Sequence, residues 1–339
     1  MSGKSLPNHE RMFAVVTVLC AAFICAQYSY RLRANTTHEM IAAAYGALHG
    51  EPGGPEFQNR LIFPVLMTAG RAALPASVSD VNLWKGLRLL TALVGFASAF
   101  ACMRAISGSW FRATIGCVLL GYGYLWTVCT HGHEHSSDFL DLAFIAVFVW
   151  LALRGRYGWL AAVTVLASFN RESAAFSGLI VIGLAMARHG LAPAAWKGFA
   201  IGGCNVALAL ITVTAARSLY RGPAIYQHVG LSDVIENWRC ALMPYGPATI
   251  LLAMLAPLTL IYYNFRGSFS TRQRGLLLGC LGCFLVTVVF GILFELRVLL
   301  PCYLILICVL VLDESSGDDQ SWFARACGAA GKSGSRPGA

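Results

Sequence analysis

The chain has 339 residues, of which 57% are hydrophobic and only 12% are charged. A soluble globular domain carries about twice that share of charged residues, so the composition excludes an ordinary water-soluble fold. The formal net charge of +9 and the mean hydropathy of +0.64 indicate a basic protein whose main solvent is lipid. The positive charge falls in short loops between apolar segments, where it faces anionic headgroups, so we expect membrane lipids as partners and no nucleic acid.

Apolar segments long enough to cross a bilayer, about 17 to 25 residues each, recur along the whole chain. The predicted fold class is therefore all-α, a polytopic helical membrane protein. The first segment is too long for a signal peptide, and no small-x-small cleavage site leads from it into a soluble domain. We predict ten transmembrane helices, at 12–30, 82–104, 113–129, 137–153, 158–169, 174–187, 198–219, 247–264, 275–294 and 298–312.

The apolar segment 61–76, "LIFPVLMTAGRAALPA", is short and is interrupted by Pro64, Gly70 and Arg71. Its crossing would decide the side of every later loop. Basic loops without any acidic residue belong in the cytoplasm. Four loops of this kind occur, at 104–112, 154–158, 187–198 and 264–275. All four lie on the cytoplasmic side only if 61–76 does not cross the membrane. We therefore predict a re-entrant or interfacial segment, with both termini cytoplasmic.

One membrane domain, residues 1–312, is expected to carry the whole function. Residues 313–339 are rich in Gly and Ser and predict a short disordered cytoplasmic tail. Abundant Ala, Gly and Arg with little Lys are typical of a GC-rich bacterial genome. The predicted location is a bacterial plasma or inner membrane.

The acidic residues are distributed asymmetrically on this topology. Every Asp and Glu before the tail, except Glu10, lies on the outer side. Ionisable groups at membrane depth usually face a bundle interior or a water-filled cavity. Five polar segments on one face predict a polar cavity open to the outside; they are 34–66, 131–136, 168–176, 220–246 and 294–303.

The segment "HGHEHSSD" has three interpretations. Its imidazole and carboxylate groups are common ligands of a divalent ion such as Mg²⁺ or Mn²⁺. They also suit binding of a phosphate or a sugar hydroxyl, and a plain solvated loop is the third interpretation. The candidate metal ligands are His131, His133, Glu134, His135 and Asp138.

Two further patterns have alternatives of their own. The turns "NRES" and "ELR" each indicate either a solvated turn or a functional site near the membrane surface. The C-x-x-C pair Cys280 and Cys283 lies inside "LLLGCLGCFLV". Small residues packing against a neighbouring helix explain that pair better than a zinc or redox site, because no His or second Cys pair lies nearby in the sequence.

The first outer segment resembles the GT-C superfamily of integral membrane glycosyltransferases. Those enzymes often place an acidic residue just after the first span. A short helix with a Tyr and a small residue follows, then a Gly-rich stretch and a basic, aromatic and proline element. The matching positions here are Glu39, Tyr45, Ala47, Gly50, "EPGGPEF", Arg60 and Pro64. The late "ELRVLLP" is similar to an acidic-Arg-Pro element that often opens one of their last spans.

The resemblance implies transfer of a sugar from a polyprenyl-phosphate donor, or another lipid substrate, to an acceptor on the outer face. A carboxylate would deprotonate the acceptor hydroxyl, and positive charge or a metal would stabilise the leaving phosphate. The candidate base is Glu39 or, as the runner-up, Glu56. The candidate substrate and phosphate contacts are Arg60, Asn170, Arg171, Glu172, Glu295 and Arg297.

Two other classes of protein remain as alternatives. A polytopic transporter or channel also carries intramembrane charges, but its path requires polar positions near mid-membrane. Arg88 and Arg217 lie within predicted spans, but both are near an outer end rather than at mid-membrane. A non-catalytic membrane scaffold would leave the polar clusters unexplained.

Overall fold

The computed structural model describes residues 8–32, 34–50, 60–129, 137–218, 269–290 and 296–312, together with 235, 258–259 and 261–262. All regular elements within these ranges are helical, which confirms the all-α class. Every predicted span in the described ranges coincides with a helix, whereas most of 247–264 and the whole tail 313–339 lie outside them. The α-helices are α1 (Asn8–Leu32), α2 (Thr37–Leu48), α3 (Ile62–Ala73), α4 (Asp80–Ser107), α5 (Trp110–Cys129), α6 (Ser137–Leu153), α7 (Tyr157–Ser168), α8 (Phe176–His189), α9 (Trp196–Ser218), α12 (Thr271–Phe290) and α13 (Leu300–Val311). The 3₁₀ turns are η1 (Ala34–Thr36), η3 (Glu172–Ala175), η4 (Pro193–Ala195) and η5 (Leu296–Leu299).

Three helical segments of the described chain are long and apolar enough to cross a membrane, namely His9–Leu32, Asp80–Ser107 and Pro193–Ser218. In the first and third of these, only 28% of the most apolar window is buried. Large apolar side chains such as Phe13 and Phe23 on α1 are more than half exposed. An apolar surface of this extent is typical of helices that face lipid, so the fold supports a membrane protein.

The local sequence explains where α4, the longest helix, begins and ends. Ser79 precedes its first turn, and the Ser79 hydroxyl accepts a hydrogen bond from the Asn82 amide (3.3 Å). Such a cap satisfies one of the orphan amides of a helix start. At the other end Gly108 adopts a left-handed conformation (φ 65°), and its amide bonds the Arg104 carbonyl. A glycine takes this conformation without the steric cost of a Cβ atom, so the chain turns there into α5.

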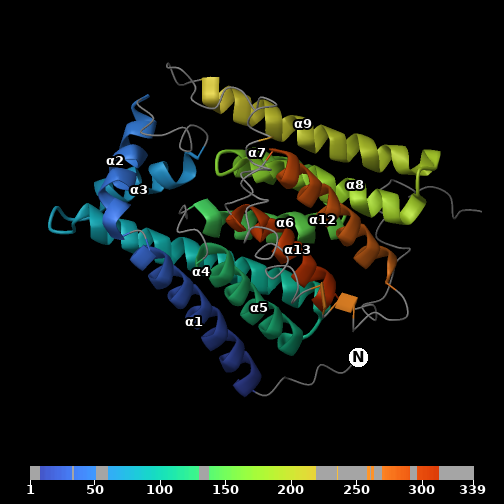
Figure 1. Cartoon of the computed structure of the whole chain (residues 1–339), viewed down its shortest axis with the longest axis horizontal. Coiled ribbons are helices and arrows are strands. Elements are labelled where there is room, and N and C mark those ends of the chain that lie inside the picture. The colour runs from blue at the N-terminus through green and yellow to red at the C-terminus, as the bar shows by residue number, and fades with distance from the viewer. Residues whose placement is uncertain are drawn as a thin grey trace, which may run out of the picture.

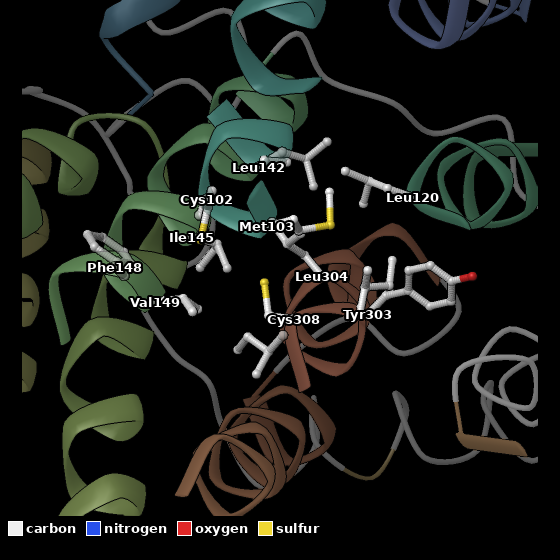
Figure 2. Packing of buried hydrophobic residues seen from close by; sticks show 14 of the residues in the cluster. Cys102, Met103, Leu120, Leu142, Ile145, Phe148, Val149, Tyr303, Leu304 and Cys308 are labelled. Atoms are coloured by element: carbon white, nitrogen blue, oxygen red, sulfur yellow. The ribbon is translucent and has the colours of Figure 1, made fainter. Parts of the chain in front are cut away.

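The centre of the bundle is formed by α6 and α13, which are buried on almost every side. Nearly all residues of α13 are buried, as are thirteen of α6, among them Phe139, Phe148 and Val149. Figure 2 shows Leu304 and Cys308 of α13 facing side chains from α4, α5 and α6. A helix that is apolar all round belongs in a core, and here α4, α5, α8 and α12 surround the pair (Figure 1).

Glycines allow α8 and α12 to pack unusually closely. A Cβ atom at Gly183 would lie 2.3 Å from the Gly279 amide nitrogen, and one at Gly275 would lie 2.8 Å from the Leu184 Cα atom. Cys283, which lies on α12, is fully buried. This geometry favours the packing interpretation of the C-x-x-C pair, because small residues let membrane helices approach backbone to backbone.

A separate layer formed by α2 and α3 lies at one end of the bundle (Figure 1). The start of α3 is fastened to the end of α7, because the Leu61 and Ile62 amides donate to the Phe169 carbonyl at 2.7 and 3.3 Å. Its far end pairs with the start of α4 through Arg71 and Asp80 (3.4 Å). Successive helices alternate in direction, so the end of α7 and the start of α4 lie at the same end of the bundle.

Both ends of α3 therefore lie at one end of the molecule, which we call the α2–α3 end. The helix has 12 residues, or about 18 Å, whereas a hydrocarbon core is about 30 Å thick. This arrangement supports the prediction that 61–76 does not cross. A small second core of apolar side chains holds the layer to α4; its members are Met40, Ile41, Ala44, Ala47, Phe63, Met67, Leu83 and Trp84.

Candidate functional site

The turn "NRES" between α7 and α8 is the centre of the candidate site. The amides of Asn170 and Arg171 both bond the Ala167 carbonyl, at 2.8 and 2.9 Å, and close the end of α7. Arg171 is then fully extended (φ −161°, ψ 160°), and η3 begins at the next residue. Because side chains alternate across an extended backbone, Arg171 and Glu172 are directed to different surroundings.

Arg171 points into a buried ionic group at the start of α6. Its guanidinium donates to the Asp138 carboxylate, and Asp141 lies 3.9 Å away. The side chain of Arg171 is 9% exposed and that of Asp138 is 0% exposed. The Ser173 hydroxyl donates to Asp141. Two carboxylates thus share one guanidinium, and Asp138 also gains from its place in the first turn of α6, where the helix dipole favours negative charge.

Asn170 completes the attachment of this turn to α6. Its side-chain amide donates to the Ser137 carbonyl at 3.0 Å, and the residue is 1% exposed. This hydrogen bond joins the end of α7 to the first residue of α6. The result is a rigid junction of α6, α7 and α8 at the α2–α3 end.

Glu172 points the other way, into a half-exposed pair. It accepts a hydrogen bond from Arg217 in the last turn of α9. The Glu172 side chain is 42% exposed and that of Arg217 is 39% exposed. Burial raises the pKa of Glu172, but the charges of Arg60 and then Arg217 lower it, and the net pKa lies below its ordinary value. Glu172 is therefore a carboxylate at neutral pH.

Arg60 lies next to both ionic groups. The hydrogen bonds of Leu61 and Ile62 to Phe169 fix the backbone that follows it beside the turn. Its charge acts on Glu172, and it also acts on Asp141. Arg60 is half-buried, and its charge offsets the excess of carboxylate in the buried group.

A second polar cluster fastens the layer of α2 and α3. The Tyr45 hydroxyl donates to Asp80 (3.2 Å), which also receives Arg71. Arg71 donates in addition to the carbonyl groups of Val78 and Pro75, the latter at 2.8 Å. Burial, and then the charge of Asp80, raise the pKa of Tyr45. These contacts are structural, because every charged member is held by another member of the cluster.

The structure brings together five of the residues predicted from sequence, and they are Arg60, Asp138, Asn170, Arg171 and Glu172. Glu39 is exposed on α2, which packs against α3 and α4 rather than against the "NRES" turn. The remaining predicted residues lie outside the described part of the chain, or their side chains do; they are Glu56, His131, His133, Glu134, His135, Glu295 and Arg297.

Sequence reasoning did not select Asp141, Ser173 or Arg217. Asp141 follows Asp138 by three residues and so lies on the same face of α6. That spacing was a usable signal, since a carboxylate inside an apolar run needs a partner. Arg217 stood out as a charge near the outer end of a span, but nothing in the sequence indicated that its partner is Glu172.

The structure describes only one of the predicted metal ligands. Among the residues that the structure describes, no group of three or more His, Cys, Asp or Glu side chains is arranged to hold a metal ion. The one described candidate ligand, Asp138, is bonded to Arg171. The prediction for residues 131–135 stays a prediction.

Comparison of the chain with protein-family models, with curated proteins and with solved structures finds no match. The chemistry of the site is consequently argued from its own residues. They form an array of three arginines and three carboxylates, assembled from four distant parts of the sequence at the α2–α3 end.

Proposed function

We propose that this protein is a membrane glycosyltransferase that moves a sugar from a polyprenyl-phosphate donor to an acceptor on the outer face. The observation that carries the proposal is the array of Arg60, Asp138, Asp141, Arg171, Glu172 and Arg217 at the end of an apolar bundle. Ionisable side chains at membrane depth are costly to bury and mark substrate or ion pathways. Guanidinium groups suit phosphate in particular, because they bind its oxygens in a bidentate way.

The layer of α2 and α3 supports the same reading. The resemblance to GT-C enzymes implies a short helix after the first span that carries an acidic residue, and α2 carries Glu39 in its first turn. The buried face of α2 fixes the helix against α3 and α4, while Glu39 stays exposed. A rigid helix that presents a carboxylate at the membrane surface suits a general base.

In the proposed reaction, Glu39 takes the proton of the acceptor hydroxyl, with Glu56 as the runner-up. The acceptor oxygen forms a bond to the anomeric carbon as the bond from that carbon to the phosphate oxygen breaks. The lipid phosphate leaves with the bonding electron pair and gains negative charge. Positive charge near the phosphate stabilises this developing charge, and Arg60 is the residue that we propose provides it.

The proposal includes ten spans with both termini in the cytoplasm and the α2–α3 end outside. Single cysteines in a variant without the native cysteines test it. Ser77 and Ser218 are exposed at the α2–α3 end, and Arg156 and Leu191 are exposed at the other. We expect a membrane-impermeant thiol reagent added outside to label positions 77 and 218 only. Labelling of 156 and 191 instead, with 77 and 218 protected, would mean that α3 crosses if the N-terminus is cytoplasmic.

The activity itself is tested with purified protein and a panel of polyprenyl-phosphate sugars, by measuring loss of the lipid-linked sugar. Removal of a general base costs about 10²–10⁴-fold in turnover, so Glu39→Gln should lose that much while the protein stays folded. Glu10→Gln, at the opposite end of α1, is the matched control and should keep full activity. If Glu39→Gln is active and Glu56→Gln is not, Glu56 is the base. If both variants remain active, neither carboxylate is the general base and the proposed mechanism is refuted.

A further inference from the structure

The pair formed by Glu172 and Arg217 is built differently from the other ionic contacts at the α2–α3 end. Two arginines from distant elements, Arg60 before α3 and Arg217 at the end of α9, act on one carboxylate. That carboxylate is 42% exposed, unlike the buried Asp138. We propose that Arg60 and Arg217 form a phosphate-binding site, and that Glu172 occupies it as an internal competitor until the substrate's phosphate displaces it.

Both arginines are held beside the turn that carries Glu172. Arg217 donates directly to Glu172, and η3, which begins at Glu172, packs against α9. The residue after Arg60 is bonded to Phe169, three residues before Glu172. Neither arginine can therefore move far from the turn without breaking backbone contacts.

The exchange is chemically reasonable because a carboxylate and a phosphate compete for the same donors. A phosphate carries at least as much negative charge as a carboxylate and has more acceptor oxygens, so it can engage two guanidiniums at once. A half-exposed ion pair contributes little to stability, which makes Glu172 easy to displace. Arg171 does not suit this role, since its displacement would leave Asp138 and Asp141 buried without their partner.

The surface of α9 indicates that the phosphate belongs to a lipid. Exposed residues recur at helical spacing along one face of α9 and end at Arg217; they are Gly203, Ala207, Leu210 and Thr214. Leu210 is 55% exposed, and a Cβ atom at Gly203 would meet nothing within 4 Å. A polyprenyl chain lying along this face would bring its phosphate to the level of Arg217. The assignment thus rests on the lipid-phosphate donor proposed above.

The test is the dissociation constant of a polyprenyl monophosphate for the full-length protein in phosphatidylcholine nanodiscs. We expect Arg217→Gln to weaken binding by about tenfold or more, as loss of a charged hydrogen bond does. Glu172→Gln should instead tighten binding by about two- to fivefold, because the competitor is gone. Arg71→Gln removes an ion pair of similar exposure at the same end and should leave binding unchanged.

The two opposite signs separate the proposal from a purely structural role. If Glu172→Gln weakens binding or leaves it unchanged, Glu172 does not compete and the proposal is overturned. Unchanged binding by Arg217→Gln overturns it as well. Each variant is first checked for an unaltered melting temperature. If Arg217→Gln fails to fold, Arg217→Lys replaces it, because lysine keeps the positive charge but cannot bind a phosphate in a bidentate way.

Two further ligands identify the source of the phosphate. Uncharged polyprenol should bind all variants equally, and inorganic phosphate should bind far more weakly than the lipid. Inorganic phosphate that binds as tightly as the lipid would overturn the lipid assignment. The binding assay also stands apart from sugar transfer. If the two variants change binding in the expected directions but no sugar is transferred, the glycosyltransferase activity is refuted and the phosphate site stands. If sugar is transferred but binding does not change in these directions, only the phosphate site is refuted.

Discussion

Arg171 and Glu172 are neighbours in the chain, yet their ion pairs are of opposite kinds. Arg171 is 9% exposed and faces two buried carboxylates, whereas Glu172 and Arg217 are each about two-fifths exposed. The cause is the extended backbone at Arg171, which sends one side chain into the junction with α6 and the next toward α9. Adjacent residues of one motif can therefore serve separate purposes.

The difference in burial decides what each pair can do. Breaking a buried pair leaves an uncompensated charge in a medium of low dielectric, so such a pair is permanent once formed. A half-exposed pair exchanges its partner for water at little cost. The first kind suits the positioning of a turn, and the second suits a site where a ligand replaces an internal group.

The largest effect is expected from removal of the buried guanidinium. Arg171→Gln should lower the free energy of unfolding by about 3–5 kcal/mol, because Asp138 and Asp141 would stay buried without the guanidinium that they share. Thermal unfolding in detergent measures this, and adding Asp138→Asn to the same variant should restore part of the loss. A loss no larger than that of Arg217→Gln would remove the distinction between the two pairs.

The half-exposed pairs should differ little from one another in stability. Arg217→Gln and Arg71→Gln break pairs of comparable exposure at the same end of the bundle. We expect each to change the free energy of unfolding by about 1 kcal/mol or less. Side-by-side unfolding of the two variants checks this, and a much larger loss for Arg217→Gln would show that its pair is structural.

The smallest effect concerns pH. The folded-state pKa of Glu172 lies below its unfolded value, so its pair stabilises the fold above the unfolded pKa of about 4.3. That contribution is lost as the pH falls through the folded-state pKa. The difference in stability between the natural protein and Glu172→Gln, within about 1 kcal/mol, should be constant from about pH 8 to pH 5 and shrink below about pH 4. A difference that grows on acidification would contradict the direction of the shift.

The helices were predictable because their signal is local. The runs that became α4, α6 and α9 are continuous in sequence, and hydropathy alone predicts them. For the segment 61–76, the length and the polar interruptions predict a helix that does not span, and the contacts at both ends of α3 are consistent with this prediction. Pro64 did not break the helix, because it falls in the first turn, where its missing amide costs nothing.

The sequence by itself determined an all-helical chain with long apolar helices, and it placed the polar turns between the right helices. Only the tertiary structure decided which charges meet. Arg171 pairs with Asp138 from 33 positions away, Glu172 pairs with Arg217 from 45 positions away, and Glu39 is exposed on a helix that packs elsewhere. The physical reason is that helix formation depends on neighbours within a few residues, whereas an ion pair depends on how separate helices pack and on which way one extended residue turns the side chains of the turn.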